Sequence, residues 1–565
     1  MHSPRLRRSA DMDLAFTHGW SGVGLAYGLV QGPMVAGLVR GRAAFHEYLT
    51  SPAFAVPLTA LAAVGMAAVS PLLGALGAAP HGLVQFAVGT ALYATLGYRG
   101  GRAAAQFETQ SKSHQRGSVV ADAPRPKFKG RARGVDAQIT LAGAAIPIAD
   151  ETKHFKLIGT TGTGKSTAIQ EILGTALERG DRAVIADPDG GYLNRFFDPK
   201  RGDVILNPFD ARSRKWDLFA EIRNAYDVDQ LARSLIPDHD GADRSWRAYA
   251  RTFFSAVTRQ AHEAGIRDLK ELYRLLVVAD TGELRALVAG TPAQPFLEEH
   301  NVRMFDSIRS VTSSAVGAID YIAQQKAEGF SIRNWVADDS PGVLFMPYKA
   351  GQIAALSSTF SGWMRLAIFE TMNREEAAER RNENPQRLWF VVDELDALGQ
   401  IDGLKDALAR LRKFGGRCVL GFQSIAQVSS TYGQGDAHTI VENCGNTLIL
   451  RCSASEGGGT ARFASQLIGE REVVRTTVSR SRRATEIMGS VSHSEQFSVE
   501  AAVLPSQIEQ LPDLAGYLKH ASDPHWHRVR LDAVRRWQMH RPAAIPGDGR
   551  NAGRGGPERG SHAHE

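Results

Sequence analysis

Cysteine is almost absent from this chain. Its 565 residues include three, Cys418, Cys444 and Cys452. They show no paired Cys-x-x-Cys spacing of the kind that holds zinc. An odd number without a framework also argues against a disulfide-built extracellular protein. The sequence therefore predicts folding in a reducing compartment, with each thiol filling a small apolar space.

Charged side chains are missing from one long stretch. Between Ser51 and Tyr98 there is no Asp, Glu, Lys or Arg. A membrane-spanning helix needs about 20 mostly apolar residues, so the stretch has room for two, near Ala53–Leu73 and Leu83–Tyr98. The alternative is a buried apolar hairpin in a soluble domain, where so long an uncharged run is uncommon. We predict a transmembrane helical hairpin at 53–98.

Basic residues predict how this hairpin is oriented. They flank it on both sides and are missing from its turn, which places both ends in the cytoplasm; they are Arg40, Arg42, Arg99 and Arg102. An earlier uncharged stretch, Leu14–Val39, is interrupted by glycines and has basic clusters at both ends. One crossing would leave one cluster outside. For the N-terminal segment 1–52 we therefore favour a surface-lying or hairpin segment over a third span.

Beyond the hairpin, the composition is that of a globular protein. Hydrophobic residues make up 43%, charged residues 22%, and the net charge is +6. This small excess permits contact with nucleic acid or an anionic membrane without requiring either. Residues 99–134 are polar and basic, and we interpret them as a juxtamembrane linker, either a solvated tether or one attracted to anionic headgroups. The Gly/Arg-rich segment 541–565 is expected to be a disordered tail.

From about Val135 short apolar runs alternate with helix-like segments, a pattern that indicates an α/β fold with a parallel sheet covered on both faces. The expected strands are Phe155–Ile158, Ala183–Ala186, Val204–Leu206, Val343–Met346, Leu388–Val392, Cys418–Phe422 and Thr447–Leu450. The strands disappear over 226–335, where leucines recur at helical spacing. We predict an α/β domain at 135–225 and 336–540 with an all-α insertion at 226–335 between its two parts.

The strongest motif is Gly-Thr-Thr-Gly-Thr-Gly-Lys-Ser at 159–166, which fits the P-loop pattern between an apolar strand and a helix. In such a loop, backbone N–H groups and the helix N-terminus face the phosphates. Lys165 is expected to reach the β- and γ-phosphates of ATP, and the Ser166 hydroxyl to ligate Mg²⁺. The expected cradle comprises Gly159, Thr160, Thr161, Gly162, Thr163, Gly164, Lys165, Ser166 and Thr167.

Two further strands end in residues suited to hydrolysis. The apolar run Leu388–Val392 ends in Asp393 and Glu394. We expect Asp393 to hold Mg²⁺, and Glu394 to orient the attacking water as general base. Another run ends in Gln423, which is expected to sense the γ-phosphate or position water. An ordinary amide at a strand end is the plainer interpretation of Gln423.

A basic helix end lies between these strands. The predicted helix Gly403–Phe414 carries leucines on one face and Arg412 on another. In an oligomeric ATPase such an arginine can reach a neighbouring subunit's γ-phosphate. A solvated helix C-terminus, where cations suit the helix dipole, is the alternative for Arg412.

Together these segments resemble the coupling proteins of conjugation systems, the TraD/TrwB type. The resemblance rests on the P-loop, Ile185–Gly191 (IADPDGG), Trp389–Leu398 (WFVVDELDAL), Leu411–Gly416 (LRKFGG) and 504–518, and covers about 53–518. It implies a RecA-like homo-hexameric ATPase on the cytoplasmic face of the bacterial inner membrane. It also implies sequence-independent DNA in the pore, and a relaxase or relaxosome and inner-membrane type IV secretion components as partners.

Three functions are compatible with these features. The leading hypothesis is an ATP-driven DNA translocase that links the relaxosome to a secretion channel. The second is a docking receptor for secretion substrates in which nucleotide acts only as a switch. The third is a DNA pump of the FtsK/HerA kind, which is disfavoured because the sequence after Trp537 is short and Gly/Arg-rich, without room for a winged-helix reader.

Overall fold

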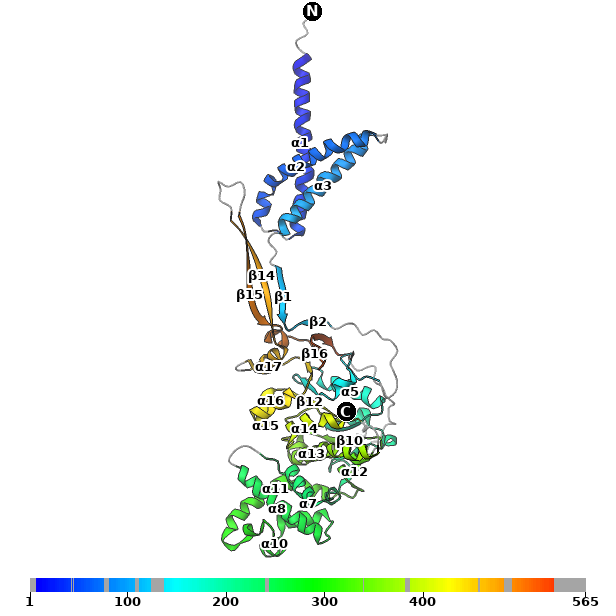
Figure 1. Ribbon diagram of the computed structural model, residues 1–565, viewed down its shortest axis with the longest axis vertical. Coiled ribbons are helices and arrows are strands. Elements are labelled where there is room, and N and C mark those ends of the chain that lie inside the picture. Colours follow the sequence, from blue (N-terminus) through cyan, green and yellow to red (C-terminus); the bar gives the residue numbers. More distant parts are fainter. Residues whose placement is uncertain are drawn as a thin grey trace, which may run out of the picture. The chain divides into compact units, whose positions relative to one another are not determined.

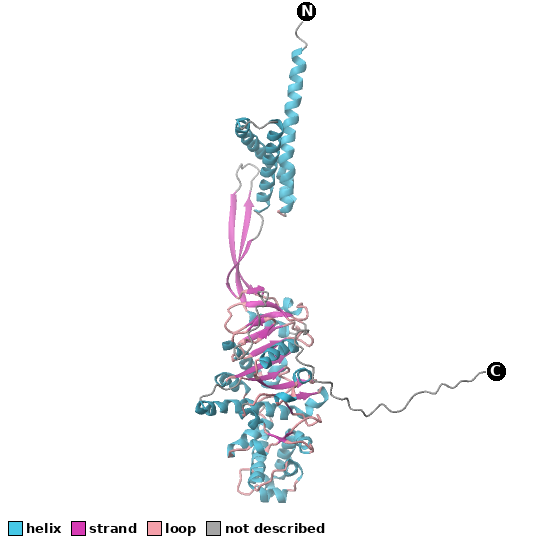
Figure 2. Cartoon of the chain, turned by 90° about the vertical axis from the view of Figure 1, so that its right-hand side faces the viewer, coloured by secondary structure: helices cyan, strands magenta, loops and turns pink. Residues whose placement is uncertain are grey.

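The computed structural model describes residues 7–41, 43, 45–75, 81–106, 111–122, 137–238, 243–338, 340–381, 387–455, 458–481 and 490–532. The predicted tail at 541–565 and the hairpin turn lie outside this part of the chain. The chain divides into two compact units, which Figures 1 and 2 display. One comprises 1–116 with 471–500, and the other 117–470 with 501–565.

Three helices begin the first unit: α1 (Arg7–Arg40), α2 (Phe45–Ala75) and α3 (His81–Gln106). α2 and α3 pack on each other as the predicted hairpin. Among the described residues, two stretches are long and apolar enough to cross a membrane, Gly22–Arg40 of α1 and Glu47–Val69 of α2. α3, which contains the predicted second span, falls short of that measure within the described residues. Apolar side chains within the second stretch are exposed, such as Val64 at 67%.

The first helix differs from one sequence-based expectation. α1 is continuous from Arg7 to Arg40, so a hairpin within Leu14–Val39 is wrong. Gly37 of α1 lies where α1 closely contacts α3, and this contact leaves no room for a side chain. A Cβ on Gly37 would lie 2.4 Å from the Tyr98 carbonyl oxygen, and one on Gly101 would lie 2.0 Å from the Met34 carbonyl oxygen. Small residues at such positions let helix backbones approach, as they do between membrane helices.

The same unit contains a sheet that the sequence does not predict. β14 (Glu470–Ser481) and β15 (Ser490–Ala501) form a long ribbon, and β1 (Ser111–Gly117) pairs with β14 (Figure 1). Residues 471–500 were predicted as part of the nucleotide-binding domain, but they belong to the first unit. The predicted linker 99–134 likewise contains the end of α3, β1 and β2 (Val120–Asp122), while 123–136 lie outside the described residues.

The second unit is built on a ten-stranded sheet, which Figure 2 shows with helices on both sides. Its strand order is β2-β17-β16-β13-β5-β12-β11-β6-β10-β7. All seven predicted strands are present and parallel, as β5 (Phe155–Ile158), β6 (Arg182–Pro188), β7 (Val204–Ile205), β10 (Val343–Tyr348), β11 (Leu388–Val392), β12 (Gly416–Phe422) and β13 (Asn446–Ile449). The sheet becomes mixed where β16 (Ala515–Lys519) pairs antiparallel with β13, and β17 (Trp526–Arg530) with β16.

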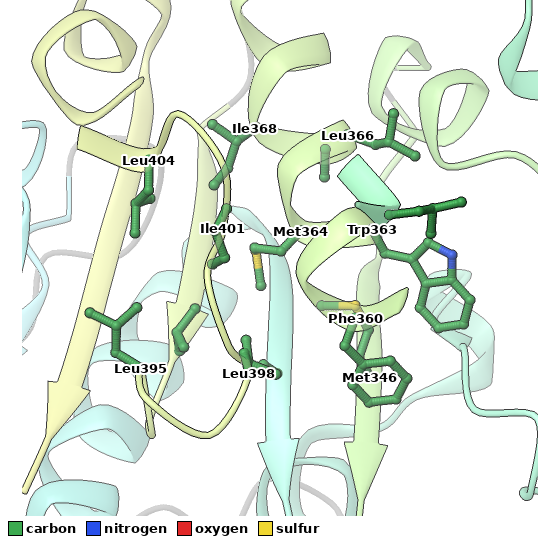
Figure 3. Packing of buried hydrophobic residues seen from close by; sticks show 14 of the residues in the cluster. Met346, Phe360, Trp363, Met364, Leu366, Ile368, Leu395, Leu398, Ile401 and Leu404 are labelled. Carbon is green, nitrogen blue, oxygen red and sulfur yellow. The ribbon is translucent and has the colours of Figure 1, made fainter. Parts of the chain in front are cut away.

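Both faces of this sheet are buried, because successive side chains of a strand point to opposite sides. Trp389 and Val391 of β11 join a cluster with Ile172 of α5 (Lys165–Glu178). Phe390 and Val392 join the opposite cluster with α13 (Ala350–Arg381). Figure 3 shows Phe360, Trp363 and Met364 of α13 in that second cluster with Met346, Leu395 and Leu398. The predicted α/β class is therefore confirmed.

The predicted all-α insertion corresponds to helices between β7 and β10. They are α7 (Ala225–Leu235), α8 (Arg244–Glu263), α9 (Leu269–Tyr273), α10 (Thr281–Leu287), α11 (Val302–Ala323) and α12 (Ile332–Ala337). Phe253 of α8 and Phe305 of α11 meet edge to face with ring centroids 5.2 Å apart. The segment 226–335 is not purely helical, because it contains β9 (Gly329–Phe330). This strand pairs with β8 (Lys215–Trp216) and brings the two ends of the segment together.

Shorter elements complete the second unit. They are β3 (Thr140–Leu141), β4 (Ala144–Ala145), α4 (Ile148–Glu151), α6 (Gly191–Phe196), α14 (Leu404–Leu411), α15 (Ile425–Tyr432), α16 (Gln434–Glu442), α17 (Gly459–Ile468) and α18 (Pro505–Glu509).

Candidate nucleotide site

The P-loop joins the buried strand β5 to the helix α5. Gly162 and Gly164 have φ of 77° and 116°, a region that glycine enters without steric cost. Gly159 has a different reason to lack a side chain, because a Cβ there would meet Thr163 Oγ1 at 2.8 Å and Leu450 Cβ at 2.9 Å. Thr167 lies half-buried in the first turn of α5. The loop therefore wraps tightly around the N-terminus of α5.

Neighbouring segments hold the loop in place. The Gly159 N–H donates to the Phe422 carbonyl at the end of β12 over 3.3 Å, and the Thr160 N–H donates to the Arg451 carbonyl over 2.9 Å. On its other side, the Leu514 N–H donates to the Thr163 carbonyl over 3.0 Å. The family-like segment 504–518, which contains Leu514, thus supports the P-loop directly.

The carboxylate of Asp393 lies against the P-loop. Ser166 Oγ donates to Asp393 Oδ2 over 2.7 Å, and the Tyr192 hydroxyl donates to the same oxygen over 2.6 Å. Asp393 is 3% exposed. Its other oxygen, Oδ1, is buried with no hydrogen-bond partner among the described residues. The structure therefore brings together the two predicted magnesium-binding residues.

Glu394 and Gln423 meet at the same edge of the sheet, because β11 and β12 are parallel neighbours. Gln423 Nε2 donates to Glu394 Oε1 over 3.3 Å, while Thr161 Oγ1 donates to Gln423 Oε1 over 2.9 Å. Burial, and then the neighbouring Asp393 carboxylate, raise the pKa of Glu394. The amide of Gln423 thus connects the P-loop to the expected general base.

Lys165 lies inside the cradle and is 7% exposed. Its ammonium group donates to the Gly159 carbonyl over 2.6 Å and to the Thr160 carbonyl over 3.3 Å. Burial lowers the pKa of Lys165, while the Asp393 and Glu394 carboxylates act in the opposite direction. A positive charge at this depth suits a phosphate ligand.

Asp187 and Tyr192 also lie at this site, although the sequence gives neither of them a role. Asp187 is the last residue but one of β6 and lies just beyond the end of β11, since Ala186 pairs with Val392. Its carboxylate accepts from the N–H groups of Tyr192 and Leu193, over 3.0 and 2.6 Å. Burial raises the pKa of Asp187 to about 6. The segment IADPDGG was recognised as family-like, but the contact of the following Tyr192 with Asp393 has no sequence signature.

Arg412 lies away from these residues. It is exposed in a single turn at the end of α14, just before β12 begins at Gly416. Gln423 follows the other end of that strand. β12 has seven residues, which correspond to about 20 Å at the usual rise per residue. Within one chain, Arg412 therefore lies near the N-terminal ends of the parallel strands, whereas the P-loop follows their C-terminal ends.

The residues present fit a nucleotide with Mg²⁺. Hard divalent cations prefer oxygen ligands, and the Ser166 hydroxyl, the Asp393 carboxylate and the partnerless Oδ1 of Asp393 provide them. Glycine backbone, a buried lysine and a helix N-terminus provide the phosphate-binding surface. The fold and this site define a P-loop nucleotide-binding protein with a RecA-like mixed sheet.

Comparisons with known proteins narrow the class. A profile described as the type IV secretion-system coupling protein DNA-binding domain matches residues 138–532. The chain is 32% identical over 391 residues to the coupling protein TraD of Escherichia coli K12, a match covering 68% of this chain and 53% of TraD. It is 26% identical over 392 residues to the coupling protein VirD4 of Bartonella quintana, covering 63% and 58%. The chain thus matches just over half the length of these relatives.

Solved structures agree with the sequence relatives. The conjugative coupling protein TrwB without its first 70 residues superposes with a TM-score of 0.65 at 30% identity, covering 74% of this chain and 94% of that one. TrwB with ADP and Mg²⁺ superposes with a TM-score of 0.63 at 29% identity, covering 75% and 94%. The chain belongs to the type IV secretion-system coupling proteins.

Proposed function

We propose that this chain is an ATPase that drives DNA through a conjugative type IV secretion system and links the relaxosome to the channel. The carrying observation is the 2.7 Å contact between Ser166 of the P-loop and Asp393 of the acid pair, with Glu394 and Gln423 beside them. A loop that binds phosphate and a base that activates water are the two parts that hydrolysis requires. Membership of the coupling-protein family supports the DNA cargo.

ATP with Mg²⁺ is the proposed substrate. The relative TrwB has been solved with ADP and Mg²⁺ and with a non-hydrolysable ATP analogue. Here the backbone of 159–166 would hold the phosphates, Lys165 would neutralise them, and Ser166 and Asp393 would hold the cation. When bound, Mg²⁺ neutralises charge on the phosphates. Every other task falls to the backbone and side chains of this protein.

Hydrolysis is assigned to two strand ends. Glu394 would orient a water molecule and accept its proton, and the burial that raises the pKa of Glu394 improves it as a base. Gln423, in contact with both Glu394 and Thr161, would transmit the state of the phosphates to the base. Arg412 can serve only the site of a neighbouring subunit, because it lies a strand's length from its own P-loop.

We place the protein as a homo-hexamer at the bacterial inner membrane, with the nucleotide unit in the cytoplasm. The apolar stretches of α1 and α2 support a membrane anchor. DNA would be gripped through its phosphates, so binding would be insensitive to sequence and weakened by salt. The relaxase and inner-membrane secretion components would be the protein partners.

ATP turnover by the full chain in lipid nanodiscs, with and without DNA, tests this proposal. The wild type should hydrolyse ATP. Glu394→Gln should bind ATP with unchanged affinity but lose about 10²- to 10⁴-fold in turnover, the usual contribution of a general base. Lys165→Ala should abolish DNA transfer in mating assays while still fractionating with membranes. Equal turnover by wild type and Glu394→Gln would favour the docking receptor instead.

A further inference from the structure

The carboxylate of Asp393 is held by a residue that belongs neither to the P-loop nor to the Asp393–Glu394 acid pair. One of its oxygens, Oδ2, accepts two hydroxyl hydrogen bonds, from Ser166 over 2.7 Å and from Tyr192 over 2.6 Å. The other, Oδ1, has no partner among the described residues. A carboxylate can rotate about its bond to Cβ, and one hydrogen bond leaves that rotation less restricted than two. The Tyr192 hydroxyl therefore helps decide which oxygen remains available.

Tyr192 is itself held rigidly. Asp189 and Gly190 both have positive φ, 57° and 70°, so β6 turns sharply into α6. The Asp187 carboxylate then accepts the N–H groups of Tyr192 and Leu193 and fixes the first turn of α6. Because β6 and β11 are neighbours, this turn carries the Tyr192 ring, 2% exposed, across to Asp393.

We propose that Tyr192 is a positioning residue of the nucleotide site. Its hydroxyl fixes Oδ2 of Asp393, which keeps Oδ1 oriented for the hydrated cation of a bound Mg²⁺–nucleotide. This role rests on the proposed function, since it presupposes that the P-loop binds nucleotide with Mg²⁺. The Tyr192 hydroxyl bonds the Asp393 carboxylate, and through that group it would act on the cation.

Tyr348, at the end of the neighbouring strand β10, provides a matched control. It lies close enough to Asp187, Asp393 and Glu394 to be affected by their charges, and is 4% exposed. Its hydroxyl is buried without a hydrogen-bond partner among the described residues. Replacing Tyr192 or Tyr348 by phenylalanine therefore removes one buried hydroxyl from the same neighbourhood, but only the first change removes a contact to Asp393.

The test compares Tyr192→Phe with Tyr348→Phe in the full chain in nanodiscs. The readout is the affinity for a fluorescent ATP analogue, measured with Mg²⁺ and with EDTA. Wild type should bind more tightly with Mg²⁺. Tyr192→Phe should reduce this gain about tenfold, the scale of one hydrogen bond to a charged group, and leave the affinity in EDTA unchanged. Tyr348→Phe should match wild type in both conditions.

A double-mutant cycle assigns the effect to the carboxylate. In an Asp393→Asn background, which has already lost the negative charge, adding Tyr192→Phe should change the Mg²⁺ gain by less than about twofold. Thermal unfolding reports whether the variants remain folded. A lower melting temperature of Tyr192→Phe with an undiminished Mg²⁺ gain would show a purely structural role and overturn the proposal.

The outcomes separate this role from the proposed function. If wild type hydrolyses ATP and Tyr192→Phe keeps the full Mg²⁺ gain, only the positioning role is refuted. An equal loss of affinity in Mg²⁺ and in EDTA would refute it as well, because the contact would then act on the loop rather than on Asp393. If wild type shows neither hydrolysis nor an Mg²⁺ gain, the proposed function and the role of Tyr192 are refuted together.

Discussion

Acidification should weaken the nucleotide unit through one buried histidine. His154 precedes β5, is 1% exposed, and uses both ring nitrogens. Its Nε2 lies 2.9 Å from the Leu408 carbonyl, and its Nδ1 accepts the Cys418 N–H over 3.1 Å. Only the neutral ring with its proton on Nε2 satisfies both partners. A second proton, on Nδ1, would face the Cys418 N–H.

The size of the effect follows from the pKa. Burial first, and then the charges of Arg417 and Arg412, lower the pKa of His154 from 6.5 to about 4. Each pKa unit corresponds to about 1.4 kcal/mol, so the difference corresponds to about 3 kcal/mol of stability. The unfolded chain takes up the proton first as the pH falls. The contribution is therefore complete above pH 6.5 and is lost between there and about pH 4.

Other buried groups titrate in the same range with the opposite sign. Burial raises the pKa of Glu221 to about 7, so this carboxyl adds stability as the pH falls. The test is therefore a difference between wild type and His154→Asn. Asparagine tolerates the φ of 56° found at this position, and its side chain does not titrate. Its lost contacts shift stability equally at every pH.

Urea unfolding of the full chain in detergent, followed by pulse proteolysis, measures both proteins across this range. The stability advantage of wild type over His154→Asn should shrink by about 3 kcal/mol between about pH 7 and about pH 4. A difference that stays constant to within about 1 kcal/mol would refute the assignment of a neutral, doubly engaged His154.

Two further predictions concern a helix contact and a buried ion pair. Gly101→Leu should separate α1 from α3, because a Cβ at Gly101 would lie 2.0 Å from a carbonyl oxygen of α1. Cross-linking of cysteines introduced into the two helices should fall, whereas Gly28→Leu, with nothing within 4 Å of its Cβ, should leave it unchanged. Arg365→Leu should cost about 3 kcal/mol in urea unfolding, because it strips a buried partner from Asp402. Arg212→Leu, which breaks an exposed ion pair, should cost less than about 1 kcal/mol, and equal costs would contradict this reasoning.

The candidate nucleotide site could be predicted from the sequence because its parts are local. A P-loop needs glycines, a lysine and a hydroxyl within eight consecutive positions, and a catalytic acid needs an apolar strand directly before it. In the structure, parallel pairing carries these strand ends to one edge, where Ser166, Asp393, Glu394 and Gln423 meet. The charge-free stretch after Ser51 likewise indicated a membrane anchor by length and composition alone.

Only the tertiary structure determined which distant segments pair and pack. β1 and β14 are separated by more than 350 residues and read as polar segments, so neither predicts a shared sheet. The glycines of α1 looked like helix breaks, yet Gly37 admits the backbone of α3. In the sequence, Tyr192 is simply an aromatic residue after a turn. Only the pairing of β6 with β11 brings its hydroxyl to Asp393. The local sequence pattern determines which helix or strand each segment can form. Which buried polar side chains meet depends instead on strand order, and no short window of sequence contains that order.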